Sequence, residues 1–171
     1  MDLKITKADL DEHNFYVGSL EDSVVVDGSI KLESYLGLVR FKFGLNVSGT
    51  IFAGVGSGIE AGLGIEAGEG IEAGWGIEAG RSIKAGRSIE AGWGIEAGEG
   101  IEAGWGIEAG LGIEAGLSID AKWISTPLRI FAGLCLWRLP ESSETEIRAT
   151  VRKGTIAFGN HIDPGIDEKK T

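Results

Sequence analysis

The sequence predicts an all-β fold, a parallel β-solenoid of six-residue repeats, and three observations lead to this prediction. Isoleucine recurs every six residues from Ile59 to Ile119 in the pattern Ile-Glu-Ala-Gly-x-Gly, without an insertion. Glycine accounts for 29 of the 171 residues, and 17 of these glycines lie between Ile59 and Ala121. In each repeat Ile and Ala are two residues apart and share one side of a strand, whereas the Glu between them faces the other side.

A helix does not fit this period. Six residues advance about 600° around a helix of about 3.6 residues per turn, so the isoleucines would not form a stripe. Each hexad instead predicts one short strand followed by a corner, where Gly-x-Gly supplies the necessary backbone freedom. Because a single hexad cannot bury its isoleucine, the hexads must coil and stack.

The hexads IEAGLG and IEAGEG at 59–64 and 65–70 resemble the hexapeptide repeat of parallel β-helix proteins. In that family three hexads form a triangular coil with the aliphatic residue inward. The resemblance covers residues 59–121 and rests on the period and on the Ile-Glu pair. It departs from the family in one respect, because the small inward residue here follows the isoleucine by two positions instead of preceding it, which leaves the handedness open.

The number of hexads per coil decides which side chains stack. With three hexads, residues 18 apart are neighbours, which places Arg81 beside Glu99 and forms the column Trp75-Trp93-Leu111. With two hexads, residues 12 apart are neighbours, which places Glu69 beside Arg81. Both registers give favourable cross-strand pairs, and the family resemblance favours three hexads per coil.

The segments that flank the repeat predict β-rich caps. Alternating apolar residues at Val24–Val26 and Leu45/Val47 predict strands that lead into the solenoid, and Leu134/Leu136 continues the strand pattern after it. Thr6 followed by Asp9 matches a capping box at the start of a short helix. The predicted parts of the chain are an N-terminal β-rich cap at 1–58, the solenoid at 59–123, C-terminal coils and a cap at 124–162, and a flexible tail at 163–171.

Charge and composition exclude several classes of protein. The formal net charge is −10, and residues 59–121 carry 12 acids against 3 bases. Such a chain is a poor candidate for binding nucleic acid or an anionic membrane directly. A single cysteine argues against a disulfide scaffold and, with no visible signal peptide, predicts a cytoplasmic location. The apolar stretch Ile130–Trp137 is shorter than the ~20 residues needed to span a bilayer.

No catalytic, cofactor or metal site is predicted. The hexapeptide-repeat family includes many acyltransferases, which use a catalytic histidine at a subunit interface. The two histidines, His13 and His161, both lie outside the repeat, and no insertion loop interrupts the coils where such enzymes bind the acyl donor. Cys135 lies between two leucines and is expected to be a half-buried small residue. The resemblance to acyltransferases is therefore the least favoured functional interpretation.

The glutamates at position two of the hexad are the most informative feature. Neighbouring coils are ~4.8 Å apart, and like charges at this distance repel by roughly 0.9 kcal/mol even in bulk water. Three acids per coil amount to about one charge per 1.6 Å, close to the value of about one per 1.7 Å for duplex DNA. In a three-sided coil the uninterrupted columns are Glu60-Glu78-Glu96-Glu114 and Glu72-Glu90-Glu108.

This charge density suggests a solenoid that imitates nucleic acid and occupies the basic groove of a protein that binds one. Acidic pentapeptide-repeat β-helices act in this way on DNA enzymes, which is a similarity of strategy and not of sequence. The predicted class is then an inhibitor of the anti-restriction or anti-CRISPR type, from a phage or mobile element. Two other origins of the ladder remain open, namely recent duplication of one hexad and the need of a solenoid for a polar surface.

Position five is the variable position of the hexad and holds Trp75, Trp93 and Trp105. If these side chains point outward, exposed tryptophans beside charge are typical of contact sites. Alternatively, they cover the corners and shield the glycine-rich backbone. The second functional class predicted is a structural protein, whose solenoid ends stack into filaments or whose faces pair into a homo-oligomer.

Overall fold

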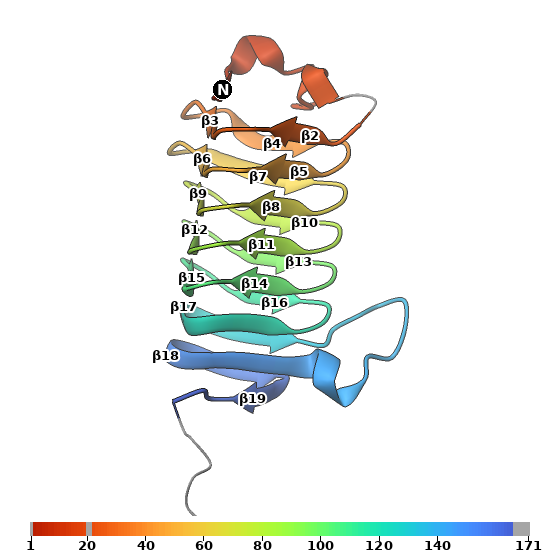
Figure 1. Cartoon of the computed structure of the whole chain (residues 1–171), viewed down its shortest axis with the longest axis vertical. Coiled ribbons are helices and arrows are strands. Elements are labelled where there is room, and N and C mark those ends of the chain that lie inside the picture. The colour runs from red at the N-terminus through yellow and green to blue at the C-terminus, as the bar shows by residue number, and fades with distance from the viewer. Residues whose placement is uncertain (1, 20–21, 166–171) are drawn as a thin grey trace, which may run out of the picture.

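The computed structural model describes residues 2–19 and 22–165, which form a parallel β-solenoid (Figure 1). Strands of successive coils pair in parallel, and Ile77 pairs with Ile95, the residue 18 positions later. The same spacing relates Glu78 to Glu96. Three hexads therefore make one coil, which confirms the predicted fold class and excludes the register of two hexads per coil.

Each side of the solenoid is a ladder of parallel strands, named here after the first repeat glutamate that it carries. The Glu60 face consists of β4 (Gly37–Phe41), β7 (Ser57–Ala61), β10 (Ile77–Ala79), β13 (Ile95–Ala97), β16 (Ile113–Ala115) and the end of β17 (Ile119–Ala132). The Glu66 face consists of β2 (Val24–Val26), β5 (Leu45–Val47), β8 (Ile65–Ala67), β11 (Ile83–Ala85), β14 (Ile101–Ala103) and the start of β17. The Glu72 face consists of β1 (Leu3–Ile5), β3 (Ile30–Leu32), β6 (Ile51–Ala53), β9 (Ile71–Ala73), β12 (Ile89–Ala91), β15 (Gly106–Ala109) and the middle of β17.

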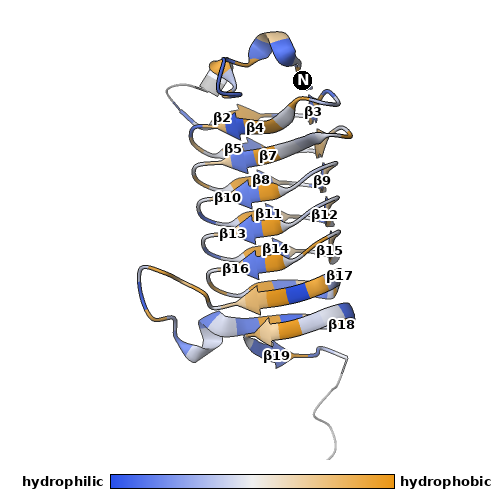
Figure 2. Cartoon of the chain, turned by 180° about the vertical axis from the view of Figure 1, so that it is seen from behind, coloured by the Kyte–Doolittle hydropathy of each residue, from blue (hydrophilic) through white to orange (hydrophobic). Residues whose placement is uncertain are grey.

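Isoleucine and alanine fill the interior of the solenoid. The repeat isoleucines are at most 1% exposed and the repeat alanines at most 7%. The residue between them in each repeat strand points outward, so polar and apolar residues alternate along the short strands of the repeat (Figure 2). This alternation confirms the predicted inward and outward positions, and stacking supplies the burial that one hexad lacks.

Position four of the hexad lies where the backbones of neighbouring coils approach most closely. A Cβ atom on Gly92 would overlap the carbonyl oxygen of Gly74 in the preceding coil. Position six is more open, because a Cβ atom on Gly94 would lie 3.4 Å from the carbonyl oxygen of Gly112. Three other hexads carry a serine at position six, namely Ser82, Ser88 and Ser118.

The coils that precede the repeat are longer. Val24 pairs with Leu45, 21 residues later, and Val39 pairs with Ile59, 20 residues later. The predicted strands at Val24–Val26 and Leu45–Val47 are confirmed, and they stack directly under the repeat strands. The ladders therefore run without interruption from residue 24 into the repeat.

A turn before the Glu60 face takes up the extra residues. Tyr35 adopts a left-handed conformation there, with φ 62°. The hydroxyl of Ser57, which is fully buried, accepts a hydrogen bond from the Leu36 N–H (3.0 Å) and donates one to the Glu33 carbonyl oxygen (2.6 Å). These two bonds tie the turn of one coil to the strand of the next.

The regular spacing ends where Lys122 replaces the position-four glycine. Ile119 and Ile124 occupy successive inward positions only five residues apart, and β17 continues from one face to the next with register shifts. The ring of Trp123 then packs on Gly106, where a Cβ atom would overlap it. β18 (Glu146–Phe158) follows β17 around the solenoid, and β19 (Asn160–Ile162) pairs with the start of β18.

The two ends of the solenoid differ. The first coils are covered by the 3-10 helices η1 (Lys7–Asp9) and η2 (Val17–Ser19) (Figure 1). Thr6 and Asp9 form the predicted capping box of η1, with 2.8 Å between the Thr6 N–H and Asp9 Oδ2. At the other end all three residues of β19 are exposed. In the predicted tail, Asp163 accepts a hydrogen bond from the Thr150 hydroxyl (2.9 Å), and residues 166–171 lie outside the described part of the chain.

A loop separates β17 from β18 and corrects one expectation. Leu134 and Leu136, predicted to continue the strand pattern, follow the last residue of β17 and belong to no strand. Gly133 turns the chain away from the ladder with φ 88°, a conformation that L-residues with side chains rarely adopt. The 3-10 helix η3 (Ser142–Thr145) returns the chain to β18.

Candidate functional site

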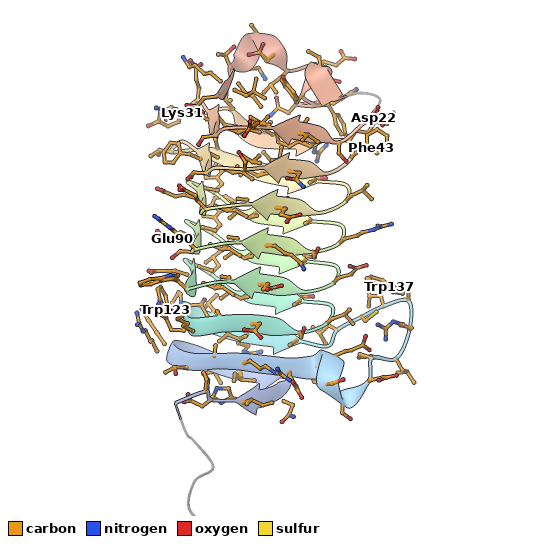
Figure 3. All side chains as sticks on the ribbon, in the orientation of Figure 1. Asp22, Lys31, Phe43, Glu90, Trp123 and Trp137 are labelled. Carbon is orange, nitrogen blue, oxygen red and sulfur yellow. The ribbon has the colours of Figure 1, made fainter. Side chains whose placement is uncertain are left out.

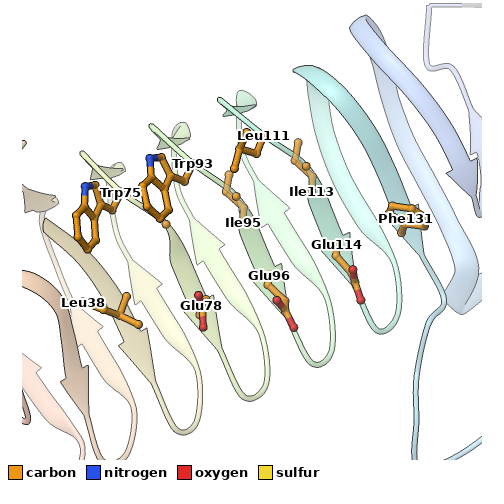
Figure 4. A pocket seen from close by; sticks show the side chains of 13 residues that line it. Leu38, Trp75, Glu78, Trp93, Ile95, Glu96, Leu111, Ile113, Glu114 and Phe131 are labelled. Atoms are coloured by element: carbon orange, nitrogen blue, oxygen red, sulfur yellow. The ribbon is translucent and has the colours of Figure 1, made fainter. Parts of the chain in front are cut away.

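A groove along one edge of the Glu60 face is the candidate site (Figure 4). It lies between a row of apolar position-five side chains and a row of carboxylates from position two, and it encloses about 350 Å³. We call it the Trp groove. Its apolar wall consists of Trp75, Trp93 and Leu111. Its acidic wall consists of Glu78, Glu96 and Glu114. Leu38 and Phe131 lie at its two ends.

The apolar wall is the predicted column of position-five residues, and it faces solvent. The Trp75 and Trp93 rings are stacked, with centroids 4.9 Å apart and an interplanar angle of 11°. Trp93 is 52% exposed and Leu111 is 46% exposed. The coil dictates this arrangement, because the Trp93 N–H donates to the Trp75 carbonyl oxygen one coil earlier. Two large rings are therefore held in contact at a corner without being buried.

Trp105 occupies a different corner, between the Glu66 and Glu72 faces. It is 59% exposed, and the Lys122 ammonium lies 4.7 Å from its ring centroid. On the same edge the Arg152 guanidinium lies 4.2 Å from the ring of Trp123 (Figure 3). Of the three tryptophans predicted as anchors, the structure brings Trp75 and Trp93 together and separates Trp105, whose neighbours are cations.

Both predicted glutamate columns are present as in-register ladders. Glu78 pairs with Glu60 on one side and Glu96 on the other, and Glu90 pairs in the same way on the Glu72 face (Figure 3). The Glu60 column begins next to a cation, because Arg40 Nε lies 2.9 Å from Glu60 Oε2. On the Glu66 face Lys84 interrupts the acids. The ladder therefore concentrates negative charge on the Glu60 and Glu72 faces.

Burial and repulsion by neighbouring carboxylates raise the pKa of Glu78, Glu90 and Glu114. For Glu78 the main cause is partial burial, followed by the negative charges of Glu96 and Glu60. Glu90 has a raised pKa for the same reasons, between Glu72 and Glu108. The charged form of these carboxylates is less stable in the folded protein than in water, so a cation placed against them would stabilise it.

Lowering the pH from 7 to 5 at low ionic strength is expected to raise the Tm by about 2 to 4 °C. The folded-state pKa values of Glu78, Glu90 and Glu114 lie above the ordinary value of 4.5. Their stabilising contribution is therefore complete below about pH 4.5 and is lost as the pH rises through the folded pKa. Glu144, whose pKa is lowered to about 2, opposes this trend only slightly, because its unfolded form begins to take up a proton only near pH 5. Thermal melting at pH 7, 6 and 5 measures the effect.

Two variants serve as controls for this experiment. Glu90→Gln removes a repulsion and is expected to raise the Tm at pH 7, whereas Glu102→Gln removes an attraction, since Glu102 Oε2 lies 3.3 Å from Lys84 Nζ. Added salt is expected to raise the Tm of the unmodified protein at pH 7 by screening the columns. A Tm that falls between pH 7 and pH 5 would contradict the repulsion.

Sequence reasoning missed two groups of residues, one that closes the Trp groove and one that is exposed on a loop. Leu38 and Phe131 close the ends of the Trp groove but lie outside the repeat, so the hexad pattern gives no signal for them. The loop after β17 exposes Leu136 (96%), Trp137 (60%) and Leu139 (93%). This loop projects on the side of the solenoid away from Trp123 (Figure 3), and the Arg138 guanidinium anchors it by donating to both carboxylate oxygens of Glu144 at 2.6 Å.

The histidines lie at opposite ends of the solenoid. His13 Nε2 is 3.6 Å from Glu12 Oε1, in the segment between η1 and η2, and His161 Nε2 is 2.9 Å from the Ala149 carbonyl oxygen, on β19. Within residues 2–19 and 22–165, no three or more His, Cys, Asp or Glu are grouped so that they could hold a metal ion. The same described residues contain no helix with the length and apolar character needed to cross a membrane.

Protein-family models, curated proteins and solved structures yield no match to this chain. The similarity to hexapeptide-repeat proteins therefore consists of the parallel solenoid and its three hexads per coil.

Proposed function

We propose that this chain is a non-enzymatic binding protein whose acidic coils occupy the basic, nucleic-acid-binding groove of another protein. The observation that supports this proposal most directly is the pair of uninterrupted glutamate columns, which project carboxylates from adjacent coils on two faces. An inhibitor of the anti-restriction or anti-CRISPR type, the role predicted from the sequence, would act by occupying such a groove.

Charge density supports the proposal. Outward position-two residues provide three charges per coil, or about one per 1.6 Å of axis, and duplex DNA carries about one per 1.7 Å. A stability-driven surface would alternate signs, as the Glu66 face does where Lys84 pairs with Glu102. The Glu60 and Glu72 faces retain their repulsion instead, which favours a use for the charge.

Basic residues limit the length of the acidic region. The Glu60 column starts beside Arg40, and on the Glu66 face Asp120 is followed by Arg148 in the next coil. The acidic coils, residues 59–121, extend about 17 Å at about 4.8 Å per coil. This length corresponds to about five base pairs of duplex at about 3.4 Å each. The proposed partner therefore has a basic groove that contacts a short stretch of nucleic acid.

The proposal is tested by competition. Proteins retained from a lysate on the immobilised chain are challenged with duplex DNA, with single-stranded DNA and with increasing salt. We expect nucleic-acid-binding proteins to be retained, to be displaced by nucleic acid, and to lose affinity steeply as salt rises. Retention that neither nucleic acid nor salt changes would contradict the proposal.

Two variants with the same change in net charge sharpen this test. The first reverses one acid on each face, Glu66→Lys, Glu90→Lys and Glu96→Lys, at a position where Lys84 already shows that lysine fits the coil. The second reverses three exposed acids outside the acidic coils, Glu12→Lys, Asp22→Lys and Glu141→Lys. The first variant is expected to bind at least about tenfold more weakly than the second.

Self-association is the second candidate function, and the exposed end of the solenoid favours it. β19 pairs with β18, and no other described strand lies along its second edge, beside exposed Phe158 and Ile162. The helices η1 and η2 cover the opposite end, so end-to-end pairing would join two C-terminal ends. Analytical ultracentrifugation decides this, because a monomer at all concentrations excludes both a dimer and a filament.

A further inference from the structure

The floor of the Trp groove is kept open by glycines that the coil itself does not require. Gly76, Gly94 and Gly112 line the groove between its two walls. A Cβ atom on Gly94 would lie 3.4 Å from its nearest neighbour, an ordinary contact distance. Position six accepts serine on both other edges of the solenoid, at Ser82 and Ser88. A Cβ atom on Gly76 or Gly112 would lie 3.3 Å from a carbonyl oxygen of the next coil, slightly closer than an ordinary contact, so a small side chain there would require a shift of a few tenths of an ångström. The floor is therefore open mainly because position six is glycine on this edge.

The walls of the groove select an amphipathic occupant. The apolar wall offers Trp75, Trp93 and Leu111, and the opposite wall offers the carboxylates of Glu78 and Glu96, whose neighbours in the ladder are also acids (Figure 4). An occupant must place an apolar stripe against the rings and a parallel stripe of cations against the carboxylates. Partial burial raises the pKa of Glu78 and Glu114, and a facing cation would stabilise their charged form.

The spacing of the coils favours a helix over an extended chain. Groove residues repeat about every 4.8 Å along the axis. One turn of an α-helix rises about 5.4 Å, so over the two steps from Trp75 to Leu111 the mismatch is only about 1.2 Å. An extended strand repeats its side chains about every 6.7 Å and would be out of step by about 3.8 Å over the same distance.

We propose that the Trp groove binds a basic amphipathic α-helix of a partner protein, with the apolar residues of the helix against Trp75, Trp93 and Leu111 and its Lys or Arg residues against Glu78, Glu96 and Glu114. This proposal rests on the proposed function and names the element of the partner that is bound. The groove spans about three coils, or about 14 Å, which accommodates about ten helical residues. The described residues of this chain form strands and 3-10 helices of three or four residues, and none of them supplies such a helix.

A pair of synthetic peptides tests the helical occupant. The first is a 15-residue peptide of Leu, Lys and Ala, with Leu at i, i+4, i+7 and i+11 and Lys on one flank of this stripe. The second has the same composition, with Leu and Lys alternating as in a strand. We expect the first peptide to bind and to gain helical circular dichroism on binding, and the second to bind about tenfold more weakly. Equal affinity of the two, or binding without a gain in helicity, would overturn the helical occupant.

Matched variants of the chain test the location. Glu78→Lys with Glu96→Lys reverses the acidic wall, and Glu72→Lys with Glu90→Lys makes the same change on a face outside the groove. Trp93→Arg and Trp105→Arg likewise compare a groove residue with one on another edge, at a position that holds Arg81 and Arg87 in the native coil. We expect each groove variant to weaken binding of the helical peptide about tenfold. Each matched control variant outside the groove is expected to weaken it less than about threefold.

The outcomes separate this inference from the proposed function. If groove and control variants weaken peptide binding equally, general charge attraction is sufficient and the groove is not the binding site, while competition with nucleic acid can still hold. If the groove variants alone weaken binding but nucleic acid does not displace natural partners, the groove assignment stands and the nucleic-acid mimic is wrong. Circular dichroism and thermal melting of every variant verify that the solenoid is intact.

Discussion

Gly92→Ala is expected to destabilise the solenoid by about 3 kcal/mol or to prevent folding. Its new Cβ atom would overlap the carbonyl oxygen of Gly74, a backbone atom that the ladder holds in place. The Gly92 N–H already donates to the Ala73 carbonyl oxygen at 2.9 Å, so the two coils cannot separate without losing this bond. Urea unfolding followed by circular dichroism measures the change in the free energy of unfolding.

Gly94→Ala, two residues later in the same hexad, is the matched control. Its Cβ atom would lie 3.4 Å from the Gly112 carbonyl oxygen, in an ordinary contact. The backbone of Gly94 is not in the left-handed region, so alanine is conformationally acceptable. We expect a change within about 0.5 kcal/mol. Similar losses for Gly92→Ala and Gly94→Ala would contradict close approach as the reason for glycine at position four.

Ile95→Ala is the second substitution with a large expected effect, a loss of about 3 to 4 kcal/mol. Ile95 is 1% exposed and stacks between Ile77 and Ile113 in the interior of the coil. Removing three carbons leaves a cavity that the neighbouring coils cannot close, because their backbones are already held at the ladder spacing. The measurement is again urea unfolding, read by circular dichroism.

Ile95→Val is the control for the core substitution, with an expected loss of about 0.5 to 1.5 kcal/mol. Valine keeps the β-branch and removes one methylene, so the difference between the two variants reports the cost of the cavity. Alanine already occupies the other inward position of every hexad, for example at Ala97. A loss below about 1 kcal/mol for Ile95→Ala would mean that the coil collapses around the smaller side chain.

The solenoid could be predicted from the repeat because each hexad contains the complete pattern of one strand and one corner. Period, alternation and the glycine corners together define which side chain is inside, and the position-five columns then follow from the choice of three hexads per coil. That choice could not be made from side-chain pairing, since both registers gave favourable pairs. The in-register pairing of Ile77 with Ile95 decides it.

Outside the repeat the sequence was less informative for a physical reason. The coils of 20 and 21 residues contain a longer side whose turn depends on Tyr35 at positive φ and on the buried hydroxyl of Ser57. Neither residue carries a pattern that indicates this role. Leu38 and Phe131 reach the Trp groove only because the coil brings residues far apart in sequence to the same edge.

The candidate site was predicted in composition but not in shape. The glutamate columns and the Trp75-Trp93-Leu111 column followed from counting by 18, and the structure bears out both arrangements. The column of carboxylates and the column of rings enclose a groove only because glycines keep the floor between them open. The same count places Trp105 on another edge, and what the repeat could not indicate is the cation beside it, because Lys122 lies where the repeat ends.

Because the hexads are nearly identical, their number also determines on which face of the solenoid every later residue lies. Adding or removing 18 residues within 59–121 changes the length by one coil and returns every later side chain to its own face. Adding or removing six residues moves every later side chain to the next face, which would transfer Phe131 away from the Trp groove. Recombination between hexads changes the gene in steps of one hexad, so only one step in three preserves the surface, and natural length variants that retain the function are expected to differ by whole coils.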